Sequence, residues 1–71
     1  MITIEDDKNR YIIRRDSIIG ISIKQCNITS DLYLIKIERN NAKDIILKFC
    51  GYDAKKRADE VYDKINFNIR R

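Results

Sequence analysis

Apolar residues occupy every second position in three segments of this chain, and that alternation is the strongest constraint on its fold. The apolar positions are Ile19, Ile21 and Ile23 in the first segment, Tyr33, Ile35 and Ile37 in the second, and Ile45, Leu47 and Phe49 in the third. Because successive side chains of a β-strand point to opposite faces of a sheet, each segment is predicted to be a half-buried strand. These residues are therefore expected to share one buried sheet face.

Shorter apolar segments and turn-forming residues complete the predicted sheet. Strands are predicted at residues 2–5, 10–14, 18–25, 31–39 and 43–50, with the first two forming a hairpin. Residues 14–17 are expected to turn the chain into the third strand. Asn40 and Asn41 tolerate a left-handed backbone, so a tight turn is expected between the last two strands.

After Gly51 the spacing of apolar residues becomes that of a helix. One stripe of an α-helix, predicted at residues 53–67 with Asp53 as its N-cap, contains Ala54, Ala58, Val61, Tyr62, Ile65 and Ile69. This helix is expected to cover one face of the sheet. The predicted fold class is therefore α+β, an antiparallel β-meander of four to five short strands with one C-terminal helix, in a single domain of 71 residues.

The second face of the predicted sheet is also apolar. The large residues that alternation assigns to it are Ile12, Ile18, Leu32, Leu34 and Ile46. An exposed apolar patch of this kind is typical of an interaction surface, so self-association into a dimer or higher oligomer is predicted through these residues. The absence of proline leaves strand edges open to pairing between copies, which is a second route to an oligomer. In the alternative interpretation, the N-terminal hairpin covers these residues within one chain.

The composition excludes several kinds of chemistry. The chain has no histidine and two cysteines, Cys26 and Cys50, so neither a metal nor a cofactor is expected and no catalytic residue is proposed. An enzyme is therefore not predicted. A disulfide between them is not expected, because no hydrophobic signal segment precedes them and the reducing cytoplasm is the expected compartment. A cysteine that alternates within a strand is typically a small core residue, which is the role expected for both. No apolar run is long enough to span a bilayer, so a cytoplasmic location is expected, that of the host if the protein is viral.

Cations at the start of the predicted helix indicate a binding site. Lys55, Lys56 and Arg57 occupy its first turn, where the helix dipole favours acids. Three cations beside free backbone N–H groups predict an anion site, with phosphate as the natural ligand. Two further basic pairs are assigned to anion binding, Arg14 with Arg15 and Arg70 with Arg71. The net charge of the chain is +4. In the alternative, ion pairs of Lys55 with Asp59 and of Lys56 with Glu60 already compensate these charges.

The order of the predicted elements resembles that of short meander-plus-helix proteins encoded by low-GC bacteria and their phages. The resemblance rests on the pattern of residues 11–13, 18–21, 33–37, 45–49 and 54–65. It implies a small accessory module, and inhibitors of host defence are a recurrent class among phage proteins of this size.

Two functions are therefore predicted. The first is a non-enzymatic, homo-oligomeric module that contacts a nucleotide, the phosphates of a nucleic acid or an acidic protein through its basic residues. The second is a protein–protein inhibitor or adaptor of phage or mobile-element type, for example against host defence, which uses the apolar sheet face or an edge strand. Neither involves a membrane or a metal.

Overall fold

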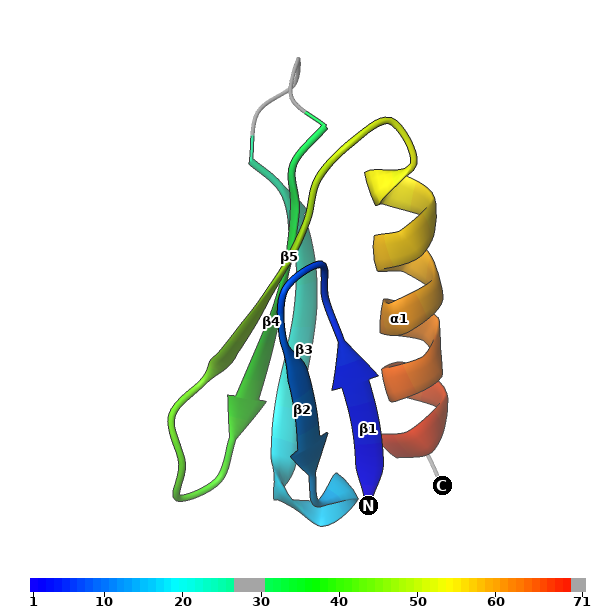
Figure 1. Ribbon diagram of the computed structural model, residues 1–71. Coiled ribbons are helices and arrows are strands. Elements are labelled where there is room, and N and C mark those ends of the chain that lie inside the picture. Colours follow the sequence, from blue (N-terminus) through cyan, green and yellow to red (C-terminus); the bar gives the residue numbers. More distant parts are fainter. Residues whose placement is uncertain (27–30, 70–71) are drawn as a thin grey trace.

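The computed structural model describes residues 1–26 and 31–69. Their elements are the strands β1 (Ile2–Glu5), β2 (Arg10–Ile13), β3 (Ile18–Gln25), β4 (Tyr33–Arg39) and β5 (Ile45–Phe49), a short 3₁₀ helix (Arg15–Ser17) and the helix α1 (Ala54–Ile69) (Figure 1). Each strand and the helix lies within two residues of its predicted ends. The predicted α+β class is confirmed.

The strands form two antiparallel sheets rather than one continuous meander. β1 and β2 make a two-stranded hairpin, and β3, β4 and β5 make a three-stranded meander with β4 at its centre. Between the two sheets the chain turns through the 3₁₀ helix, where the Ser17 hydroxyl donates to the Arg14 carbonyl oxygen at 2.6 Å. This turn separates β2 from β3, so the hairpin does not extend the meander (Figure 1).

One face of the meander carries the core, and both the hairpin and α1 cover it. The buried residues are Ile2, Ile4 and Ile13 of the hairpin, Ile35, Ile37, Ile45, Leu47 and Phe49 of the meander, and Ala54, Ala58 and Ile65 of α1. Val61, Tyr62 and Ile69 are half-buried against them, so the predicted apolar stripe of the helix is confirmed. The hairpin lies on the same face as α1, and it does not cover the opposite one.

The start of β3 departs from simple alternation. Ile18 pairs with Arg39 whereas Gly20 pairs with Glu38, so Ile19 is an extra residue in the β3 strand. As a result Ile18 packs against the core, and Ile19 is 67% exposed. The predictions that Ile19 lies in the core and Ile18 on the second face are both wrong. A β-bulge shifts the pattern by one residue, and counting every second position cannot detect it.

Two residues with positive φ place the turns that follow β4 and β5. Asn41, in the predicted turn, has a φ of 60°, and Gly51, between β5 and α1, has a φ of 107°.

Cys26 and Cys50 are free thiols and both are exposed, so the expectation that they are core residues is wrong. Each cysteine lies one residue beyond the end of a strand, where alternation no longer determines burial.

Candidate functional site

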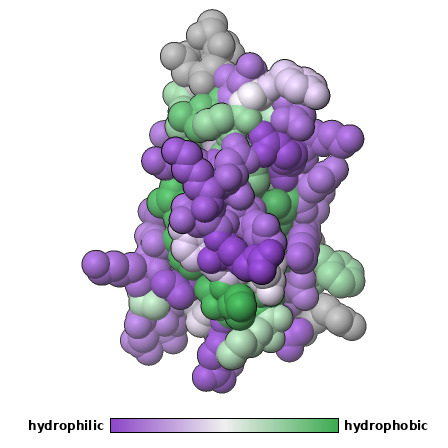
Figure 2. All heavy atoms as spheres, viewed as in Figure 1, coloured by the Kyte–Doolittle hydropathy of each residue, from purple (hydrophilic) through white to green (hydrophobic). Residues whose placement is uncertain are grey.

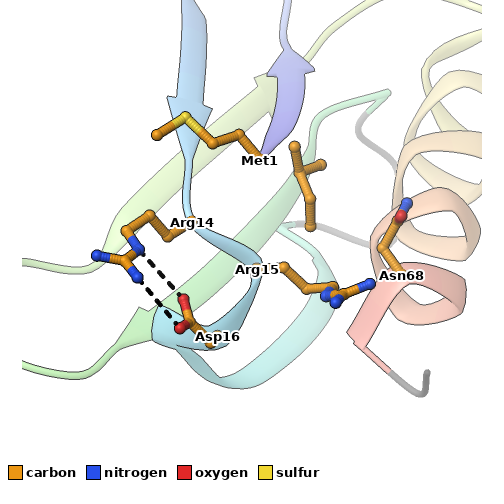
Figure 3. A pocket seen from close by; sticks show the side chains of 6 residues that line it. Met1, Arg14, Arg15, Asp16 and Asn68 are labelled. Carbon is orange, nitrogen blue, oxygen red and sulfur yellow. Dashed lines mark hydrogen bonds and ion pairs between the residues drawn. The ribbon is translucent and has the colours of Figure 1, made fainter.

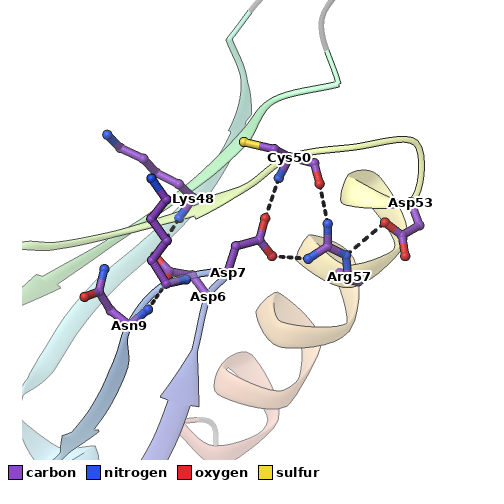
Figure 4. Close-up of polar contacts among 8 residues, drawn as sticks. Asp6, Asp7, Asn9, Lys48, Cys50, Asp53 and Arg57 are labelled. Atoms are coloured by element: carbon purple, nitrogen blue, oxygen red, sulfur yellow. Dashed lines mark hydrogen bonds and ion pairs between the residues drawn. The ribbon is translucent and has the colours of Figure 1, made fainter.

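Arg57, one of the cations predicted to bind an anion, is surrounded by partners from its own chain. Its Nε donates to Asp53 Oδ1 at 3.0 Å, and its terminal nitrogens donate to the Asp7 carboxylate and the Cys50 carbonyl oxygen (Figure 4). The guanidinium also lies 5.9 Å from the centroid of the Phe49 ring. Arg57 therefore joins the hairpin loop, the end of β5 and the first turn of α1, and these partners already compensate its charge.

The loop of the hairpin holds the outer edge of β5 through two adjacent carboxylates. The Lys48 backbone N–H donates to Asp6 Oδ2 at 3.0 Å, and the Cys50 backbone N–H donates to Asp7 Oδ2 at 2.9 Å (Figure 4). These side chains take the place of a further strand at this edge. The sequence analysis placed this segment between the two strands of the predicted hairpin and missed its role, for which the two adjacent acids were the available signal.

These contacts lower the pKa of both carboxyl groups. Burial raises the pKa of Asp6, but backbone hydrogen bonds, the strongest of them from Lys48, outweigh it and hold the pKa below the ordinary 3.8. For Asp7 the largest cause is the backbone hydrogen bond from Cys50, and the Arg57 side chain lowers the pKa further. The hydrogen bond to Asp7 is also the main reason that the pKa of Arg57 is raised.

Stability should therefore fall in acid through these two groups. A carboxyl group with a lowered folded-state pKa favours folding above its unfolded-state pKa of about 3.9, and this contribution is lost as the pH falls through the folded value. We expect Asp7→Asn to lower the free energy of unfolding by about 1 kcal/mol at neutral pH, because asparagine has one acceptor oxygen and no charge, whereas both oxygens of the Asp7 carboxylate accept hydrogen bonds. The difference from wild type should shrink as the pH falls below the unfolded-state pKa of about 3.9 and through the lowered folded-state pKa, because the wild-type carboxyl group becomes neutral. Urea unfolding followed by circular dichroism, at neutral pH and in acid, measures the free energy of unfolding of both proteins.

Asp16→Asn is the matched control for this experiment. Asp16 lies 3.4 Å from Arg14, but both side chains are more than 70% exposed, so the substitution should change stability by less than about 0.5 kcal/mol. The role assigned to the hairpin loop would be contradicted if the two variants lost the same free energy of unfolding. It would also be contradicted if Asp7→Asn remained equally less stable than wild type in acid.

The start of α1 does not gather its three cations on one surface. While Arg57 turns to the hairpin loop, Lys55 Nζ lies 3.3 Å from Asp59 Oδ2, which is the predicted compensating pair. The shallow hollow at this end of the helix is lined by Tyr52, Asp53, Lys55, Lys56, Asp59, Glu60 and Asp63, so four acids accompany two lysines. The charges around this hollow therefore attract an anion less strongly than the sequence pattern of the helix start indicated.

The predicted pair Arg14 and Arg15 lies at the other end of the molecule. An open pocket of about 370 Å³ there is lined by Met1, Ile2, Arg14, Arg15, Asp16 and Asn68 (Figure 3). Arg14 is turned to Asp16, whereas the Arg15 side chain extends toward Asn68 near the end of α1 (Figure 3). The predicted anion-binding residues Arg70 and Arg71 lie outside the described residues.

A set of lysines that the sequence analysis did not single out lies on the face of the meander opposite the core. We call this the outer face; its residues are Gly20, Ser22, Lys24, Leu34, Lys36, Glu38, Ile46 and Lys48, as the register of β3, β4 and β5 sets them. Lys24 and Lys48 flank Leu34 in one row across the sheet, and Lys36 lies in the next row. Neighbouring strands are about 4.8 Å apart, so the Cα atoms of Lys24 and Lys48 are about 10 Å apart.

The three lysines are exposed, and no described element covers the outer face. Lys36 Nζ lies 3.6 Å from Asp44 Oδ2, a surface ion pair between side chains that are both more than 40% exposed. Such a pair contributes little and exchanges readily with a stronger anionic partner. The outer face can therefore present three ammonium groups to one ligand.

The residues predicted to form an oligomer interface do not share one surface. Leu34 is half-buried and Ile46 is 40% exposed, both on the outer face, whereas Ile12 is 64% exposed on the separate hairpin. Ile18 packs against the core, and Leu32 precedes β4. In the view of Figure 2 the surface is mainly hydrophilic, with hydrophobic residues in separate patches. On the outer face, lysines lie beside both Leu34 and Ile46, so they interrupt the predicted apolar surface.

Comparison of the chain with protein-family models, with curated proteins and with solved structures finds no match. The residues that the structure describes contain no group of three or more His, Cys, Asp or Glu side chains suited to a metal ion. Within residues 1–26 and 31–69, no helix has the length and hydropathy to cross a membrane. The features that bear on function are therefore those of a small α+β protein with an open, lysine-bearing sheet face.

Proposed function

We propose that this chain is a small non-enzymatic binding module that contacts the phosphates of a nucleic acid through its outer face. The observation that supports the proposal is the convergence of Lys24, Lys36 and Lys48 from three adjacent strands on one uncovered surface. Lysine is a compact charge on a flexible stem, which suits contact with successive phosphates of a backbone. Leu34, which is half-buried, lies between Lys24 and Lys48 in the sheet, and the aliphatic stems of lysines at such positions can cover an apolar neighbour.

The composition of the outer face favours backbone contacts over base recognition. None of its eight residues is aromatic, and Tyr33 and Phe49 face the core. Sheets that read single-stranded bases normally stack them on exposed aromatic side chains. Binding should therefore depend weakly on base sequence and strongly on salt, since each neutralised phosphate of a duplex contributes about −0.9 to the slope of log K against log salt.

The double variant Lys36→Glu/Lys48→Glu tests this function. We expect it to weaken binding to a labelled DNA duplex by at least about tenfold and to reduce the salt slope by about two, because two phosphate contacts are lost. Both side chains are exposed, so the fold should be retained. Fluorescence anisotropy over a salt series, with single-stranded DNA, RNA and free nucleotides alongside the duplex, measures affinity and class of ligand together.

The matched control is Lys55→Glu/Lys56→Glu, which changes the net charge by the same amount at the start of α1. The control should retain more of the affinity, because acids already surround these two lysines. Equal losses in the two variants would show that net charge alone governs binding. If the wild-type protein binds none of these nucleic acids at low salt, the proposal fails.

A second candidate function is that of an inhibitor or adaptor that binds an acidic protein. Leu34 and Ile46 favour it, since apolar side chains among cations suit a protein partner better than a phosphate backbone does. Leu34→Ser separates the two functions, because it removes apolar contact area and leaves the lysines unchanged. Loss of a protein partner with unchanged duplex binding would support this second function.

A further inference from the structure

The two edges of the meander differ in how their backbone groups are satisfied. At the β5 edge, the carboxylates of Asp6 and Asp7 accept hydrogen bonds from the N–H groups of Lys48 and Cys50. At the other edge, β3 pairs with β4 and with no other strand among the described residues. β3 has eight residues and no proline, so its sequence does nothing to block further pairing.

The hydrogen-bond pattern of β3 shows which of its backbone groups face outward. The Cys26 N–H donates to the Leu32 carbonyl oxygen at 3.1 Å, next to the β3–β4 ladder. In an antiparallel ladder the bonded pairs recur at every second residue, so the even-numbered residues of β3 direct their N–H and C=O groups toward β4. Ile21 and Ile23 direct theirs away from the sheet. Their side chains are half-buried against the core, beside this same edge.

We propose that β3 pairs antiparallel with β3 of a second copy, about a two-fold axis at Ser22, to form a continuous six-stranded sheet. In this register Ile21 of one copy lies opposite Ile23 of the partner subunit, and both direct their outward-facing backbone groups at each other. The side chains of these isoleucines also meet on the core side, which buries the part of their surface that one copy leaves exposed. The bulge at Ile19 limits the regular pairing to residues 20–24.

Charges on the outer face favour this register over one with its axis at Lys24. A Cβ atom at Gly20 would lie 3.6 Å from Glu38 Cδ, so the Glu38 side chain occupies the space over Gly20. With the axis at Ser22, Lys24 lies opposite Gly20 of the partner subunit and within reach of the partner's Glu38. An axis at Lys24 would instead place two lysines directly opposite each other, which is unfavourable.

This pairing is independent of any ligand, and its test uses none. If it is present, the outer faces of the two copies become one surface with two sets of the lysines described above. If the protein is a dimer but binds no nucleic acid, the proposed function is refuted and the dimer is not. If a strict monomer binds nucleic acid, the dimer is refuted and the proposed function is not.

Disulfide cross-linking tests both the pairing and its register. Ser22 and Ser22 of the partner subunit would form a non-hydrogen-bonded pair with Cα atoms about 4.5 Å apart, within the range that a disulfide spans. In a background with Cys26→Ser and Cys50→Ser, we expect Ser22→Cys to give a covalent dimer in high yield on mild oxidation. Lys24→Cys is the control, since four residues, or about 13 Å along the strand, would separate it from its own counterpart.

Light scattering after size exclusion gives a second measurement. We expect the wild-type mass to be twice 8.5 kDa, and the Ser22→Lys variant, which places two cations at the axis, to elute at 8.5 kDa with an unchanged circular dichroism spectrum. A wild-type protein that stays at 8.5 kDa at millimolar concentration would overturn the proposal. A dimer that Ser22→Lys leaves intact and that Ser22→Cys fails to cross-link would overturn it as well.

Discussion

Replacement of Leu47 by alanine should lower the free energy of unfolding by about 2–5 kcal/mol. Leu47 is fully buried and pairs across the sheet with Ile35, which is also fully buried. Removal of its isopropyl group would leave a cavity in the core that the hairpin, the meander and α1 share. For a domain of 71 residues this loss is a large part of the total stability, so the variant should be partly unfolded at 37 °C. Urea unfolding followed by circular dichroism measures the change.

Leu34→Ala is the matched control, because it makes the same chemical change on the outer face of the adjacent strand. Leu34 is half-buried, and its neighbours across the sheet are Lys24 and Lys48. We expect a loss of less than about 1.5 kcal/mol, since the water-exposed part of the side chain contributes little. Equal losses at the two positions would mean that the outer face is covered in solution, and the binding surface proposed above would then be wrong.

The second large effect is expected from Ala58→Leu. Ala54 and Ala58 are fully buried on the side of α1 that faces the core, and their small side chains let the helix lie close to the sheet. A larger side chain should push the helix away or force strained rotamers, with a loss of about 1–3 kcal/mol. Leucine and alanine are both strong helix formers, so the loss would come mainly from packing.

Thermal unfolding is a suitable measurement, since 1 kcal/mol corresponds to about 4–8 °C for a domain of this size. Lys56→Leu introduces the same side chain at an exposed position of α1 and should leave the midpoint nearly unchanged. A stabilised Ala58→Leu variant would show that the helix and sheet are less closely packed than described.

The sequence predicted the fold correctly in those segments where buried residues recur at a regular spacing. Alternation located β4 and β5, and the stripe from Ala54 to Ile69 located α1, because each pattern repeats within one element. The bulge at Ile19 broke this reasoning, since one extra residue reverses the faces and leaves no mark in composition. The separation of the hairpin from the meander was missed for a similar reason. The turn at Arg15–Ser17 determines the direction in which the chain leaves β2, and the spacing of apolar residues carries no information about that direction.

The candidate site was harder to predict because its contacts join distant segments. Asp7 and Arg57 are 50 residues apart, and no local spacing indicates that the hairpin loop meets the start of α1. The lysines of the outer face were each visible as polar residues of a strand. Their convergence depends on the register of β3 with β4 and of β4 with β5, which the structure supplies.

The carboxylates at the β5 edge also bear on how far an assembly of this protein can grow. A strand that joins β3 of one copy to β3 of another uses up the open edge of both, and the two edges that remain are those held by Asp6 and Asp7. In the proposed dimer the combined sheet would therefore end at six strands, and the acceptor carboxylates at its two outer edges would disfavour elongation into a fibre. In such an assembly the acidic hairpin loop would limit polymerisation, while β3 stays available for pairing.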